Sequence, residues 1–162
     1  MKPTTLAAPF AAGLLAAAGA VAQETPQLPE SLDDFTHIHS LVIADEQSPL
    51  YGFHHFHPNA TGWETFAAQS GFPYPEGTIF LAAVYEVRSD GAQHDEGGPR
   101  LWAIMRKDPA ATETGGWRFA AFGPDGAYIA QDERAACFEC HTAREDTDFV
   151  FSEPLGMALP RP

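Results

Sequence analysis

Two cysteines and a histidine stand together near the C-terminal end of the chain, in the run Cys137-Phe138-Glu139-Cys140-His141. This C-x-x-C-H pattern is typical of covalent haem attachment, in which the two thiols add to the vinyl groups of the porphyrin. The adjacent imidazole then lies beneath the ring, where it can ligate the iron. The run predicts one covalently bound haem c, held by Cys137 and Cys140, with His141 as an axial ligand of the iron.

The same spacing of cysteines also occurs in zinc half-sites, in thioredoxin-like redox pairs and in local disulfides. A zinc site of the usual kind needs a second pair of ligands at similar spacing, and the chain has no cysteine beyond these two. A redox C-x-x-C is expected early in a βαβ unit, whereas this one comes late in the chain. The haem interpretation is therefore favoured over all three.

The N-terminal segment predicts export. It begins with Met1-Lys2, continues through an apolar, alanine-rich stretch and ends in Ala20-Val21-Ala22, the small-x-small pattern of a signal-peptidase site. The stretch is too short and too rich in alanine for a convincing membrane span, so an uncleaved anchor is the weaker alternative. We expect residues 1–22 to be a signal peptide and the remainder to be periplasmic, the compartment in which covalent haem is attached.

The chain is strongly acidic, with a formal net charge of −13. Such a surface argues against nucleic acid or an anionic membrane as a partner. It keeps an exported protein soluble, and it also suits docking to a basic redox partner protein. Residues 23–162 are long enough for one domain with its own core. We divide them into a flexible N-terminal arm (23–35) and a haem domain (36–162).

The remaining pattern predicts a β-rich α+β fold, a mostly antiparallel sheet with a few short helices. Runs of β-branched and aromatic residues predict strands over 36–43, 51–57, 78–87, 101–106 and 117–122, with a polar turn region over 89–99. A capping box from Thr61 to Glu64 predicts a short helix that ends near Ser70. Asp132 is expected to cap the haem-attachment helix near the C-terminus.

Several segments resemble the cytochrome P-460 family, and together they cover most of the chain after the leader. They are the late haem run followed by Asp146-Thr147-Asp148-Phe149-Val150-Phe151, the segment Gly115-Gly116-Trp117-Arg118-Phe119-Ala120-Ala121-Phe122-Gly123, the strand opening Pro75-Glu76-Gly77-Thr78, and Pro49-Leu50-Tyr51-Gly52-Phe53-His54-His55. The resemblance implies a β-rich, often homodimeric protein whose c-type haem iron is five-coordinate. Related cytochromes c′-beta bind diatomic gases, and the enzymatic members oxidise hydroxylamine.

One position separates these two branches of the family. The enzymatic members carry a lysine that is crosslinked to the porphyrin, on the strand after Gly77-Thr78. The matching residue here is Ala82, which has no nucleophile. Lys107 is the only lysine after the leader, and we interpret it as the solvated end of a different strand.

The strand that carries Ala82 also suggests what faces the iron. Phe80, Ala82 and Val84 share one face by period-two spacing. If Ala82 faces the haem as the matching lysine does, the three form an apolar distal pocket that leaves the iron open to a small gaseous or nitrogenous ligand. The alternative is that they are ordinary core residues.

Histidines and methionines offer other ligands. By strand alternation His37 and His39 share a face, as do His55 and His57, and these or His54 could bind a second metal or supply a sixth ligand to the iron.

Met105 or Met157 could instead ligate the iron opposite His141, although methionine more often fills gaps in a core.

The sequence thus predicts an exported mono-haem c-type cytochrome that binds ligands such as nitric oxide and takes part in nitrogen-oxide redox chemistry. A hydroxylamine-oxidising enzyme and a low-spin electron-transfer cytochrome are the alternatives.

Overall fold

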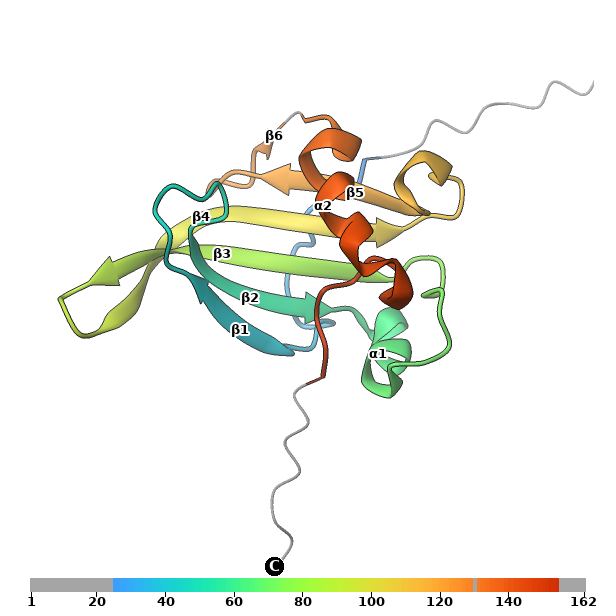
Figure 1. Cartoon of the computed structure of the whole chain (residues 1–162), viewed down its shortest axis with the longest axis horizontal. Coiled ribbons are helices and arrows are strands. Elements are labelled where there is room, and N and C mark those ends of the chain that lie inside the picture. The colour runs from blue at the N-terminus through green and yellow to red at the C-terminus, as the bar shows by residue number, and fades with distance from the viewer. Residues whose placement is uncertain (1–24, 130, 155–162) are drawn as a thin grey trace, which may run out of the picture.

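A six-stranded antiparallel sheet dominates the computed structural model, which describes residues 25–129 and 131–154 (Figure 1). The expected signal peptide and Met157 lie outside the described residues. Each strand pairs with the next one in the sequence, so the sheet order is β1-β2-β3-β4-β5-β6. The strands are β1 (His39–Ile43), β2 (Gly52–Pro58), β3 (Ile79–Ser89), β4 (His94–Lys107), β5 (Trp117–Phe122) and β6 (Tyr128–Ile129). The predicted fold class is confirmed.

Strands β3 and β4 run further than the sequence predicts. The polar region expected to be a turn continues the ladder instead, with Val87 opposite Glu96 and Ser89 opposite His94. This part of the hairpin extends beyond the neighbouring strands (Figure 1) and is mostly exposed on both sides. Because neither face is buried there, the apolar alternation that marks a strand is missing from the sequence.

The first helix, α1 (Ala60–Ala68), begins two residues earlier than predicted. Its cap is Asn59, whose Oδ1 accepts hydrogen bonds from the backbone N–H of Gly62 at 3.2 Å and of Ile79 at 3.0 Å. Thr61 therefore lies inside the helix and not at its cap. The helix ends at Gln69, which takes a left-handed conformation.

The C-terminal helical segment covers residues 134–147. It consists of a π-helical turn (Arg134–Phe138), the α-helical turn α2 (Glu139–His141) and a 3₁₀ stretch (Thr142–Thr147). Asp132 caps its start as predicted, since its Oδ1 accepts from the backbone N–H of Arg134 at 3.0 Å. A further 3₁₀ turn lies at Thr112–Thr114. Within the described residues no helix is both long and apolar enough to cross a membrane.

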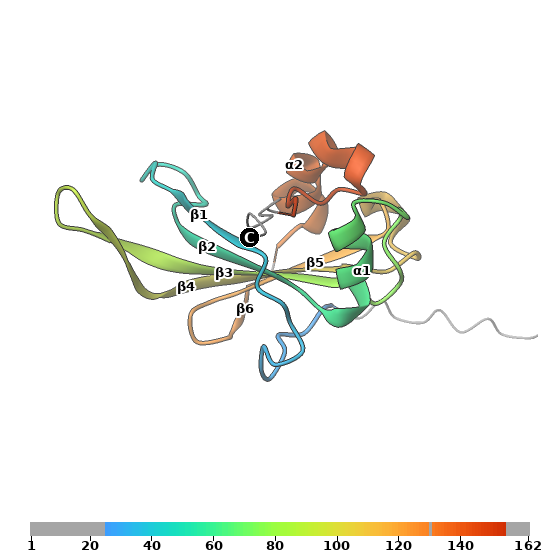
Figure 2. The same ribbon diagram turned by 90° about the horizontal axis from the view of Figure 1, so that it is seen from below.

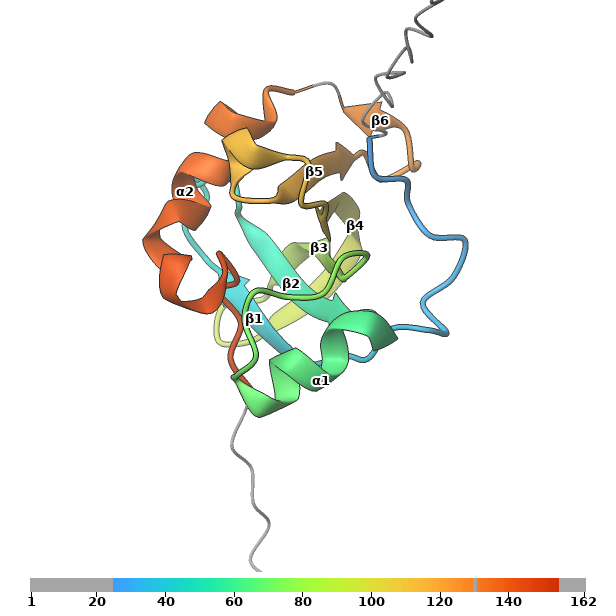
Figure 3. The same ribbon diagram turned by 90° about the vertical axis from the view of Figure 1, so that its right-hand side faces the viewer.

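Different segments of the chain pack on the two faces of the sheet. Figure 2 shows α1 and the segment of α2 on one side, which we call the helix face, and the N-terminal segment on the other, which we call the arm face. Figure 3 shows the same separation from the side. The helix-face core consists of Phe66, Tyr74, Phe80, Met105, Trp117, Phe119 and Val150. The arm-face core consists of Leu81, Ala83, Ile104, Ala120 and Phe122, packed against Leu28, Leu32 and Phe35.

Acid is expected to destabilise this fold through its buried histidines. His54 on β2 is only 4% exposed, its Nε2–H donates to the Leu50 carbonyl at 2.6 Å, and burial lowers its pKa below the ordinary 6.5. Burial likewise lowers the pKa of His39, His57 and His141. Below about pH 6.5 the unfolded chain binds more protons than the folded protein, so stability decreases as the pH is lowered through that range and is level above it.

Urea denaturation should therefore give a smaller free energy of unfolding at pH 5.5 than at pH 7.5. The His54→Gln variant should show a smaller difference between the two pH values. His94→Gln, which changes an exposed histidine of the β3–β4 hairpin, should leave the difference unchanged. Equal stability at both pH values in the unmutated protein would contradict the assignment.

Candidate haem-binding site

Both cysteines of the C-x-x-C-H run are free thiols on the C-terminal helical segment. Cys137 packs against the helix-face core, and its sulfur accepts a hydrogen bond from Gln131 Nε2 at 3.3 Å. Burial, with smaller contributions from Glu133 and Cys140, raises the pKa of Cys137 to about 11. A thiol with this pKa stays protonated at neutral pH, whereas redox-active pairs depend on a thiolate. The surroundings of Cys137 therefore disfavour a role for this residue as the reactive thiolate of a redox pair.

The imidazole of His141 is held in one orientation. Its Nδ1–H donates to the Phe149 carbonyl at 2.7 Å, so in the neutral ring the lone pair is on Nε2. Burial lowers the pKa of His141, which favours the neutral ring. Its centroid lies 5.2 Å from that of Phe119 and 5.1 Å from that of the exposed Phe151. A neutral imidazole fixed through one nitrogen is the arrangement that ligates metals.

An uncovered apolar area lies on the helix face of the sheet. The register aligns Ala82, Ala103 and Ala121 across β3, β4 and β5. Ala82 and Ala103 are only half-buried although they lie in central strands, whereas Ala83, on the arm face, is 1% exposed. Small side chains that are partly exposed leave room for a flat apolar group.

The three residues predicted to line a distal pocket lie on this same face. Phe80 and Val84 are buried on either side of the half-buried Ala82. Phe80 belongs to the helix-face core, against which Cys137 also packs. The residues present thus fit a haem, with thiols and a free imidazole nitrogen on one element and an apolar surface on another.

Lys107 is not the solvated strand end that the sequence suggests. Its side chain is 6% exposed, and its Nζ lies 2.7 and 2.8 Å from the two carboxylate oxygens of Asp148. The ammonium group also lies 4.8 Å from the ring centroid of Trp117. The chain that follows the C-terminal helical segment returns over this end of β4 and supplies the carboxylate, so the lysine is buried with its counter-ion.

This ion pair anchors a strained turn next to His141. Asp148 and Phe149 both have left-handed backbones, with φ of 51° and 68°, which non-glycine residues rarely adopt. The backbone N–H of Tyr74 donates to the Asp148 carboxylate at 2.8 Å, and Trp117 Nε1–H donates to the Asp148 carbonyl at 2.9 Å. The sheet therefore fixes the backbone at Asp148. The carbonyl of the next residue, Phe149, accepts the hydrogen bond that orients the His141 ring.

The histidines are not distributed as strand alternation predicts. His39 stacks on Phe56 on the helix face, with ring centroids 4.7 Å apart, and its Nδ1 is buried without a hydrogen-bond partner. His37 lies instead beside His55 and His57 on the arm face, because it precedes β1 and is outside the regular strand. The expectation that His37 and His39 share a face is wrong, whereas that for His55 and His57 is confirmed.

These features, a C-x-x-C-H run and a fixed imidazole against a β-sheet, suit a cytochrome built on a sheet. Ordinary helical cytochromes c carry their attachment run near the N-terminus, whereas here it lies on a late helical segment against a sheet. The family model for cytochrome P460 matches residues 29–152, and the chain belongs to this family. A search of curated proteins returned no match. Family membership implies a haem cofactor, in agreement with the donors found at the site.

Proposed function

We propose that this protein is an exported mono-haem c-type cytochrome that binds a small ligand such as nitric oxide at a five-coordinate iron. Cys137 and Cys140 attach the haem, and His141 ligates the iron through Nε2. The observation that carries the proposal is the His141 ring, fixed through Nδ1 with Nε2 free, on the helix face of a sheet whose central Ala82 and Ala103 are only half-buried.

When bound, the haem supplies an iron centre that takes diatomic ligands and changes oxidation state. The chain holds and orients that centre and controls access to it. Phe80, Ala82 and Val84 carry no polar side-chain atom, so this surface gives a ligand no hydrogen bond and disfavours water. Such a surface suits small, weakly polar ligands.

The surroundings of two residues argue against the alternatives. Lys107 is the only lysine after the leader, and its ammonium group is held by Asp148, so it cannot serve as the porphyrin crosslink of the hydroxylamine-oxidising enzymes. Met105 is buried in the helix-face core, opposite Phe80 and Phe119 in the sheet, where it acts as a packing residue and not as a sixth ligand. Both observations support an open, uncrosslinked haem.

The proposal also places the protein in the periplasm and gives it a redox partner protein and a second copy of the chain as partners. Export through residues 1–22 brings the chain to the periplasm, where haem is attached to C-x-x-C-H runs. The acidic surface suits a basic redox partner protein, and the family resemblance suggests a homodimer.

The optical spectrum of the ferrous protein tests the proposed coordination. We expect a high-spin spectrum without sharp α and β bands, and carbon monoxide binding that displaces no side chain. A low-spin spectrum that becomes high-spin in Met105→Ala or His39→Ala would identify a sixth ligand and favour electron transfer instead.

Substitution at Ala82 tests whether this strand faces the iron. Ala82→Phe should slow carbon monoxide association in stopped-flow measurements, roughly tenfold or more, by filling the space above the alanine row. Ala82→Gly, the matched control, should bind at an equal or higher rate. Equal rates for the Phe and Gly variants would show that another surface faces the ligand.

A further inference from the structure

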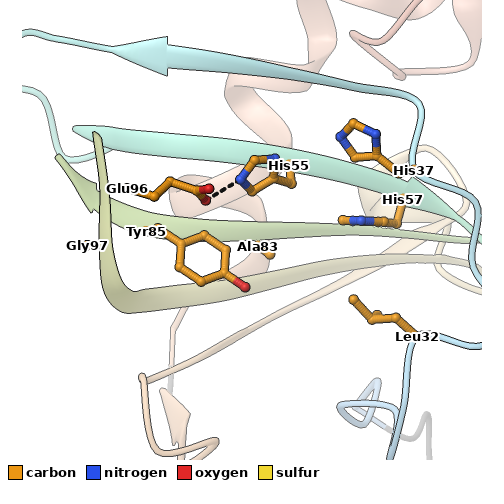
Figure 4. Close-up of a pocket in the computed structure, with 8 residues that line it drawn as sticks. All are labelled: Leu32, His37, His55, His57, Ala83, Tyr85, Glu96 and Gly97. Carbon is orange, nitrogen blue, oxygen red and sulfur yellow. Dashed lines mark hydrogen bonds and ion pairs between the residues drawn. The ribbon is translucent and has the colours of Figure 1, made fainter. Parts of the chain in front are cut away.

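A cavity of about 360 Å³ lies on the arm face of the sheet, on the side away from His141. Three imidazoles point into it, from His37 before β1 and from His55 and His57 on β2 (Figure 4). Leu32, Tyr85 and Glu96 complete most of its wall. The proposed haem chemistry uses none of these residues.

Two of the imidazoles converge on one hydroxyl group. His37 Nε2 lies 2.8 Å from Ser40 Oγ, and the same oxygen lies 2.6 Å from His55 Nδ1. His55 Nε2–H donates to the Glu96 carboxylate, so Nδ1 of a neutral His55 carries the lone pair. In metal sites, the histidine ring nitrogen that does not bind the metal usually donates a hydrogen bond to a carboxylate, a backbone carbonyl or water.

The third imidazole has an unused polar atom. Nδ1 of His57 is buried and has no hydrogen-bond partner. The His57 centroid is 5.2 Å from that of His37, and the His37 and His55 centroids are 5.7 Å apart. Two imidazoles on one tetrahedral zinc ion, with nitrogen–metal bonds of about 2.0–2.1 Å, have centroids separated by about 5 Å. The His37 ring therefore lies, from each of the other two rings, at nearly the distance that a shared ion requires.

As the hydrogen bonds stand, no three His, Cys, Asp or Glu side chains among the described residues surround a common ion position. The Ser40 hydroxyl lies between two of the rings, and an ion would have to displace it or accept it as a ligand.

We propose that His37, His55 and His57 bind one divalent transition-metal ion, of the zinc, copper or nickel class, on the face of the sheet opposite the haem. Imidazole is the ligand these ions favour, and the acidic chain attracts cations. Ser40 moves from between the rings when the ion binds, and Glu96 keeps His55 in the tautomer that presents Nδ1.

Calorimetric titration with zinc chloride tests the site, using the untagged, haem-loaded protein after treatment with a chelator. We expect one zinc ion per chain and an affinity that falls at least tenfold in His57→Gln. His94→Gln, the matched control, should bind as tightly as the unmutated protein. Zinc should leave the Soret band unchanged, because the ion lies on the other face of the sheet.

Two further variants keep the outcome decisive. If His57→Gln does not fold, His37→Gln gives the same test, since His37 is exposed and lies outside the strands. Cys137→Ser/Cys140→Ser should still bind zinc, so failure of the haem proposal would not be mistaken for failure of this one. No binding, or binding that survives both histidine substitutions, would overturn the proposal.

Discussion

Replacing Asp148 by Asn is expected to lower the free energy of unfolding by about 3–5 kcal/mol, because it leaves the ammonium group of Lys107 buried without a counter-ion. Lys107→Met should cost a similar amount, since it leaves the carboxylate unpaired. The double variant should lose less than the sum of the two single losses, because neither buried charge then remains. Urea denaturation of the four proteins at pH 7.5 measures the cycle.

The ion pair between Arg144 and Glu153, whose side chains are 27% and 64% exposed, provides the control. Arg144→Gln should cost no more than about 1 kcal/mol, because surface ion pairs contribute little. A similarly small loss in Asp148→Asn would show that the buried pair does not anchor the turn at Asp148 and Phe149.

The second large effect concerns haem attachment. Cys137→Ser/Cys140→Ser should abolish covalent haem entirely, because a hydroxyl does not form the thioether to a vinyl group. Extraction of the denatured protein into acidified organic solvent should then remove all the haem from the double variant and none from the unmutated protein. Single variants should each retain one thioether or fail to mature.

Met105→Leu provides the control for this experiment, since it changes a buried side chain of the helix-face core without touching a proposed donor. It should keep its haem through the extraction. If the unmutated protein releases haem as readily as the double variant, the attachment assignment is wrong.

Local patterns in the sequence predict much of the fold. The strand over 117–122 has its predicted ends, because Phe119 and Ala121 on one face alternate with Ala120 and Phe122 on the other, between turns that fix both limits. The antiparallel arrangement follows from strands separated by short turns. The C-x-x-C-H run is local as well, so its position on a late helical segment is readable from the sequence.

Contacts between distant residues could not be predicted in this way. Lys107 and Asp148 are 41 positions apart, and no spacing rule joins them. Gly115 is a related case, because a Cβ atom at this position would lie 2.4 Å from the Phe149 ring. The position requires glycine only because the turn at Phe149 packs against the loop that contains Gly115. The bend that separates His37 from His39 likewise depends on how the chain enters the sheet.

The intact mass of the purified, denatured protein tests the central claim most directly. We expect the mass of the mature chain plus one unmodified haem, because thioether addition to vinyl groups loses no atoms. A deficit of two hydrogens, with a haem-linked peptide that contains Lys107, would show a crosslink and restore the enzymatic interpretation. The mass of the bare chain, from protein exported by cells competent in haem attachment, would contradict the assignment of Cys137, Cys140 and His141 as a c-type haem site.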